Sequence, residues 1–260
     1  MSQLILPKVF IIGESKIDSV GLQQLLNHLS VPAWKSDADT DVEKLLEVYG
    51  RACYKSFDVI LNPNLTRVRK HNDEYIKNII EKGDGSVLEH GMINFFFADV
   101  SRVFTHELVR HRVGTAISQE SLRFVRLTDL NWYAPICIQE DVQAMEIFSR
   151  TLNSLSQLQK DLADLYNIDN MSFEKKKELT SAFRRLAPDG LATNIGWSAN
   201  IRTIRHVLEM RTNPSAEEEI RLVFSQVGKL MRERYKTLFD DYETEIVNGI
   251  DWYKTKHRKV

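Results

Sequence analysis

The stretch of sequence that most constrains the fold is an aromatic-rich segment followed directly by a cluster of charged residues. Residues 92–100 contain three consecutive phenylalanines together with isoleucine and valine, a composition that favours a buried strand. Residues 103–109 then place apolar side chains at positions 103, 104, 108 and 109, which fits the buried face of a helix. We therefore expect a strand and then a helix, with the charged cluster where the helix ends.

The charged cluster begins with Arg110-His111-Arg112 and extends to Phe124. Arg110 and Arg112 would be about 200° apart around a helix and cannot share one of its faces. Either they act on different sides of the helix, or the helix ends near Gly114, because glycine is a common stop signal. Guanidinium groups fit phosphate or carboxylate, so the cluster indicates recognition of an anion. A solvated loop with ordinary salt bridges is the alternative interpretation.

Composition narrows the class of protein. The chain has 260 residues and a formal net charge of −1, which gives no electrostatic support for general binding to nucleic acid or to a membrane surface. No apolar run is long enough to span a bilayer, and the first residues do not form a signal peptide. Two cysteines, Cys53 and Cys137, are too few for a disulfide framework and indicate a reducing, cytoplasmic location. We expect both thiols to be buried.

The pattern of apolar residues predicts an α+β fold in a single domain spanning residues 1–260, with a small antiparallel sheet and several long helices. We expect a buried strand at residues 9–12. Asn213-Pro214, followed by three glutamates, is typical of a helix start. The basic tail at residues 254–259 is expected to fray. Helices are predicted at residues 20–29, 41–54, 73–82, 142–166, 172–186 and 193–210.

A metal site at the charged cluster is not expected. His106 and His111 are five residues apart, whereas a zinc-protease helix needs its two histidines four apart. A spacing of five leaves the two rings about 140° out of alignment around the helix. Neither cysteine pairs with another at zinc spacing, so we predict no metal ligand.

The predicted helix at residues 193–210 and the residues just after it carry further polar groups. Asn200 and Arg211 are eleven residues apart, so on a helix they lie nearly on one face and about 16 Å apart. Such a face can contact two parts of an extended ligand, together with Arg202, Arg205 and His206. A solvated polar face accounts for the same residues without any ligand.

Five stretches occur in an order that points to a known family. They are Arg51-Ala52-Cys53-Tyr54-Lys55-Ser56-Phe57, Ser86-Val87-Leu88-Glu89-His90, Arg110-His111-Arg112 followed by Ser121, Arg184-Arg185-Leu186-Ala187-Pro188, and Asn200-Ile201-Arg202 through His206 to Arg211. Together they resemble the flavin-dependent thymidylate synthases. Eight residues separate Arg112 from Ser121, one more than in that family. The agreement covers roughly residues 45–240, which leaves residues 1–44 as an N-terminal extension.

The resemblance implies a homotetramer of α+β subunits, with FAD and dUMP bound where subunits meet. It implies methylation of dUMP to dTMP, in which 5,10-methylenetetrahydrofolate gives the carbon and NADPH supplies electrons through FAD. Arg211 matches the catalytic arginine placed against the uracil ring. Positions that match flavin contacts are Ser86, Arg110, His111, Arg112, Gln119, Asn200, Arg202 and His206. Positions that match dUMP contacts are Glu107, Arg110, Glu120, Ser121, Arg123, Arg184 and Arg211, and the family often has glutamine where Glu107 stands.

Two other classes of protein would use the same arginines. One is a nucleotide hydrolase or transferase that binds no flavin. The other is a relative without catalytic activity that binds a nucleotide or RNA, although the balanced charge argues against strong binding to nucleic acid.

Overall fold

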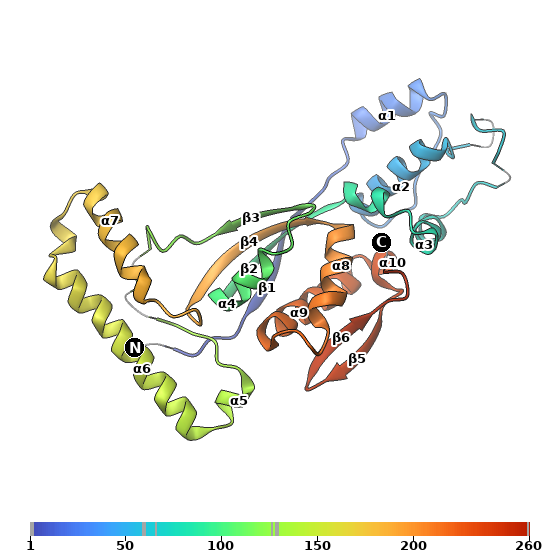
Figure 1. Ribbon diagram of the computed structural model, residues 1–260. Helices are drawn as coiled ribbons and strands as arrows, with labels where there is room; N and C mark the ends of the chain where they lie inside the picture. Colours follow the sequence, from blue (N-terminus) through green and yellow to red (C-terminus); the bar gives the residue numbers. More distant parts are fainter. Residues whose placement is uncertain (1–2, 59–60, 66, 126, 128–129, 259) are drawn as a thin grey trace.

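A computed structural model describes residues 3–58, 61–65, 67–125, 127, 130–258 and 260 of the chain. Within that part, an antiparallel sheet has the strand order β1-β2-β4-β3, and β5 and β6 form a separate hairpin (Figure 1). The strands are β1 (Lys8–Glu14), β2 (Met92–Ser101), β3 (Thr115–Gln119), β4 (Ala192–Asn200), β5 (Glu243–Val247) and β6 (Ile250–Lys254). The expected α+β class with a small antiparallel sheet is confirmed.

Helices make up most of the remaining chain. They are α1 (Ser19–His28), α2 (Asp41–Tyr54), α3 (Asn72–Lys82), α4 (Arg102–Leu108), α5 (Ile136–Gln139), α6 (Val142–Leu165), α7 (Phe173–Phe183), α8 (Ile201–Thr212), α9 (Glu218–Arg234) and α10 (Lys236–Phe239), with short 3₁₀ turns at η2 (Gly85–His90), η3 (Ile168–Asn170) and η4 (Arg184–Leu186). In Figure 1, α6 and α7 lie at one end of the sheet and α1 to α3 lie at the other. No helix in the described residues is long and apolar enough to cross a membrane.

The main core lies on one face of the sheet. Side chains alternate between the two faces of a strand, and Phe95 of β2 lies opposite Trp197 of β4 with both side chains buried. The ring of Trp197 meets Phe224 of α9 edge to face, with ring centroids 5.7 Å apart. Helices α8 and α9 therefore cover this face, and both pack on the hairpin as well.

The strand expected at residues 9–12 is present as β1, but the expectation that it is buried is wrong. Phe10 is 48% exposed and Ile12 is 67% exposed. β1 is an edge strand, and these two side chains lie on the face of the sheet that α8 and α9 leave uncovered. Phe96, opposite Phe10 in the register, is also exposed.

The helix predicted at residues 193–210 is wrong in its first half. Thr193, Ile195 and Trp197 are buried while the residues between them are only half-buried, which is the period of two expected for a strand. β4 therefore runs to Asn200, and α8 begins at Ile201 with Asn200 as its N-cap. The strand brings Asn200 to the edge of the sheet where the helix starts.

Three expectations for the C-terminal part and the cysteines are also corrected. Asn213 does not begin a helix but is the C-cap of α8. The next helix starts at Glu218, because Glu217 is its N-cap and the Glu217 carboxylate accepts from the first free N–H groups of α9.

The tail does not fray over its described residues: β6 pairs with β5, and Val260 is 3% exposed. Lys259 lies outside the described residues. Both cysteines are exposed rather than buried.

A buried arginine holds the tail in place. Arg205 of α8, one of the polar residues that the sequence places on this helix, is fully buried. Its guanidinium donates to the Asp241 carboxylate at 2.7 and 2.8 Å and to the carbonyl of Val260 at 3.3 Å. Burial alone would raise the pKa of Asp241, but the hydrogen bonds and the charge of Arg205 hold it below its usual value. Arg205 therefore has a structural role and does not contact a ligand.

We expect Arg205→Ala to lower the free energy of unfolding by about 3–5 kcal/mol, because it leaves the partly buried Asp241 carboxylate without its partner. Urea unfolding at neutral pH and fixed protein concentration measures the change. Lys254→Ala, which breaks an exposed pair with Glu245, is the matched control and should cost less than about 1 kcal/mol. Equal losses in the two variants would contradict the structural role of Arg205.

Candidate functional site

The Arg-His-Arg motif lines a cavity of about 360 Å³ between the loop that follows α4 and the N-terminal half of α8. Helix α4 ends at Leu108, so the chain leaves the helix before Arg110. Of the two alternatives given for the motif, the second holds: the arginines lie on a loop and not on different sides of a helix. The helix ends at Leu108, however, which is earlier than the expected end near Gly114. The lining residues are Glu89, Arg110, His111, Arg112, Val113, Asn200, Arg202, Thr203, His206 and Val207.

Gly114 determines how closely the loop approaches α8. Its φ is +68°, in the left-handed region that favours glycine, and a Cβ there would lie 2.2 Å from Asn200 Nδ2. The Gly114 carbonyl accepts from Asn200 N at 3.1 Å. Asn200 Oδ1 in turn accepts from Thr203 N at 2.8 Å and caps α8. The motif is thus held against a helix N-terminus, where the backbone favours anions.

The cleft carries positive charge that the protein does not neutralise. Arg110 and Arg112 are exposed, and neither forms a salt bridge with a carboxylate among the described residues. Arg202 donates to Glu89 at 2.6 Å, which fixes its position across the cleft. Uncompensated guanidinium groups beside a helix N-terminus suit a phosphate or diphosphate.

His111 is neutral in this site. Arg211 Nε donates to His111 Nε2 at 2.7 Å, so Nε2 is an acceptor and the ring proton is on Nδ1. The pKa of His111 is lowered to about 4, chiefly by burial and in addition by the charges of Arg211 and His206. A neutral imidazole can therefore orient Arg211 without opposing its charge.

Arg211 is held from a second side by Glu107 of α4. Arg211 NH1 donates to Glu107 Oε2 at 2.7 Å, and NH2 lies 3.4 Å from the Glu107 carbonyl oxygen. Both side chains are partly buried, at 18% and 30% exposure. Arg211 does not line the cavity itself but lies behind His111, which does.

A second group of predicted residues gathers beyond the other end of β3. Glu120 follows that strand and accepts from Asn194 Nδ2 at 2.9 Å. Ser121 begins a turn in which its carbonyl accepts from the backbone of Phe124 at 3.0 Å. The side chain of Arg123, within the turn, is exposed.

Helix α7 supports the turn that carries Arg123. The Thr180 hydroxyl lies 2.7 Å from the carbonyl oxygen of Arg123, which can accept its proton. Arg184 follows Thr180 by one helical turn at the end of α7, on the same side of the helix.

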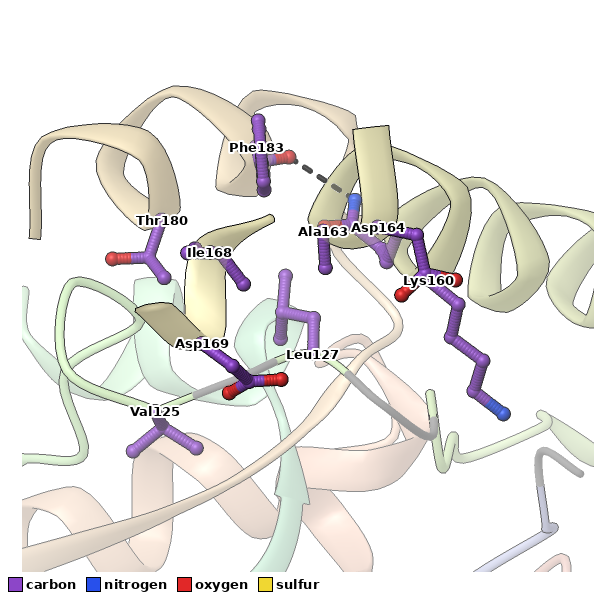
Figure 2. A pocket seen from close by; sticks show the side chains of 10 residues that line it. Val125, Leu127, Lys160, Ala163, Asp164, Ile168, Asp169, Thr180 and Phe183 are labelled. Atoms are coloured by element: carbon purple, nitrogen blue, oxygen red, sulfur yellow. Dashed lines mark hydrogen bonds between the residues drawn. The ribbon is translucent and has the colours of Figure 1, made fainter. Parts of the chain in front are cut away.

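Behind the Arg123 turn, α6, η3 and α7 enclose a cavity of about 190 Å³, in which Gln159 Nε2 donates to the Phe183 carbonyl at 3.1 Å (Figure 2). No residue predicted to bind FAD or dUMP lines this cavity.

The two groups are not brought together within one chain. β3 has five residues, so its first and last Cα atoms are roughly 13 Å apart at about 3.3 Å per step. The Arg110 cleft lies at one end and Arg123 at the other. The remaining predictions fall outside the cleft lining: Gln119 donates to Thr105 Oγ1 at 3.2 Å, and Ser86 is exposed on η2.

Four residues that line the cleft were not predicted as site residues: Glu89, Val113, Thr203 and Val207. Glu89 lies in one of the five motif stretches, and that position was the available signal, because its pair with Arg202 is formed across 113 positions of the chain. Val113 and Val207 carry no chemical signal, because apolar side chains line cores and clefts alike. Among the described residues, no group of three or more His, Cys, Asp or Glu is placed to hold a metal.

Comparisons with known proteins show the family of this chain. The family model for thymidylate synthase complementing protein matches residues 36–235. Flavin-dependent thymidylate synthases from Corynebacterium diphtheriae and Corynebacterium glutamicum are each 34% identical over 220 residues, covering 83% and 82% of this chain and 85% and 84% of the relatives. Thymidylate synthase X from Helicobacter pylori, crystallised with FAD and dUMP, shares the fold, with a TM-score of 0.59 at 16% identity over 91% of this chain and 98% of that chain. The chain therefore belongs to the flavin-dependent thymidylate synthase family.

We expect His111 to stay neutral from pH 8 down to about pH 5, because its pKa lies near 4. NMR of ¹³C-labelled histidine, with His111→Gln to assign the signal, measures the titration. In Arg211→Ala the pKa of His111 should rise, since one nearby positive charge is removed. The unfolded chain takes up this proton near pH 6.5, so the stabilisation is present above that pH and is lost as the pH falls toward 4. A midpoint near 6.5 in the folded protein would contradict this.

Proposed function

We propose that this protein converts dUMP to dTMP, using 5,10-methylenetetrahydrofolate as the carbon donor and NADPH as the source of electrons, with FAD as its cofactor. The observation that carries the proposal is the Arg110-His111-Arg112 cleft, with Arg211 fixed behind His111, in a chain of this family. A nucleotide hydrolase or transferase without flavin would need an activated water or nucleophile. None of the described residues around the cleft has that arrangement.

The cleft fits the diphosphate of FAD. Arg110, Arg112 and Arg202 supply guanidinium donors, and the capped N-terminus of α8 adds its dipole. The Asn200 amide and the His206 ring bring hydrogen-bonding groups that can contact the rest of the cofactor. We propose the same for Ser86 and Gln119, which lie outside the cleft of a single chain. When bound, FAD would supply the hydride chemistry.

Arg211 is proposed to act on the uracil ring of dUMP. A ring that becomes nucleophilic gathers negative charge on its carbonyl and nitrogen atoms. A fixed guanidinium stabilises that charge without reorganising, and it does so more strongly where water is excluded. Arg123, Ser121 and Arg184, together with Glu120, would hold the nucleotide and orient its ring. The phosphate of dUMP suits Arg123 and Arg184 because both are exposed cations.

We further propose that the chain forms a homotetramer in which subunits share sites. Phe10, Ile12 and Phe96 expose apolar surface on one face of the sheet, and a neighbouring subunit would cover it. The separation of the Arg110 cleft from Arg123 along β3 supports the same assembly. A second copy would bring one chain's Arg123 to the other chain's Arg211.

The direct test is the purified protein with FAD, NADPH, methylenetetrahydrofolate and dUMP. We expect a bound flavin whose absorbance is bleached by NADPH, a response of that spectrum to dUMP, and formation of dTMP. Product is measured by chromatography, with dUMP omitted as the control. A protein that stays colourless after addition of FAD, yet hydrolyses or transfers nucleotide phosphate, would instead establish the flavin-free alternative.

Shared sites are tested by mixing two inactive variants. Arg211→Ala should form no dTMP while FAD stays bound, and Arg123→Ala should weaken dUMP binding more than FAD binding. When the two are co-expressed with different tags and purified through both tags, about a quarter of the sites combine two intact halves under random pairing. We therefore expect activity to return in the mixture. Continued inactivity of the mixture would show that each site lies within one chain.

A further inference from the structure

Glu107 occupies a position that matches a nucleotide contact, but its bonds are made to Arg211. Oε2 accepts from Arg211 NH1 at 2.7 Å, and the backbone carbonyl lies 3.4 Å from NH2. The two residues belong to α4 and α8 and are 104 positions apart in the chain. The pair therefore connects the helix before the Arg-His-Arg motif to the helix that carries the catalytic arginine.

We propose that Glu107 is a positioning residue for Arg211 and not a ligand of the dUMP phosphate. The proposal rests on the function proposed above. An ionised carboxylate has no proton to donate, so it cannot hydrogen-bond to phosphate oxygens. Its negative charge would also repel the phosphate. The same charge suits a guanidinium, with which it makes a charge-assisted bond.

The geometry leaves Arg211 free to act on a ligand. A guanidinium has five N–H donors. His111 takes the Nε donor, and Glu107 takes one donor from NH1 and meets one from NH2. One donor on each terminal nitrogen remains. Three contacts, one with His111 and two with Glu107, thus fix the plane of the guanidinium and leave two donors for a ligand, as preorganised stabilisation requires.

The charge of Glu107 matters as well as its shape. A glutamine has the same length, and its amide oxygen can still accept from NH1. That bond is a hydrogen bond to a neutral group, roughly half as strong as one to a carboxylate. Glu107→Gln should therefore loosen Arg211 without removing any part of the nucleotide site.

The experiment compares Glu107→Gln with the wild-type holoenzyme in two independent measurements. We expect kcat to fall about fivefold to tenfold, while the Kd of dUMP, measured by calorimetry, stays the same or becomes tighter as a negative charge is removed. Glu245→Gln is the matched control, because its pair with Lys254 is also 2.7 Å long but lies exposed on the β5–β6 hairpin. That control should change neither value.

Other results would overturn the proposal. Weaker dUMP binding in Glu107→Gln would make Glu107 a nucleotide contact, and an unchanged kcat would mean that Arg211 does not need it. If the wild-type protein makes no dTMP, the proposed function fails separately. A crystal structure of Glu107→Gln then decides the positioning role: a displaced Arg211 guanidinium supports it, and an undisturbed one contradicts it.

Discussion

The cleft depends on the close approach of Gly114 to Asn200. Only a residue without a side chain can take the left-handed backbone at position 114 while its carbonyl accepts from Asn200. Asn200 is both the last residue of β4 and the N-cap of α8. One contact therefore joins the loop, the sheet and the helix. Without it, the arginines would not lie beside the N-terminus of α8, and His111 would not reach Arg211.

Arg205 and Arg211 lie on the same helix, α8, but differ in burial, and this difference distinguishes a structural role from a functional one. Arg205 is fully buried, and its charge is neutralised by Asp241, so nothing remains to act on a ligand. Arg211 is only partly buried, and its partners leave donors unused. The two residues are six positions apart, on different faces of α8. The core thus fixes α8 through Arg205, while another face of the helix holds Arg211 against His111, which lines the cleft.

The α+β class and most helix positions were predictable from the sequence, because periodic apolar residues and caps are local signals. β4 was missed because its alternation runs directly into the helical pattern of α8, and the boundary at Asn200 depends on pairing with β2 and β3. The cleft residues of the Arg-His-Arg motif were found from chemistry and spacing. Arg205 could not be told from a ligand-binding residue, because its partner Asp241 is distant in sequence.

The separation of Arg123 from the cleft argues for more than one chain at each site. β3 is paired with β4 along its length, and this pairing holds its two ends apart. Under the proposed function, a nucleotide bound by both Arg123 and Arg211 would therefore meet them on different subunits. The exposed face of β1 and β2 lies on the same sheet. Burial of that apolar face would stabilise the assembly and, in the same step, complete the site.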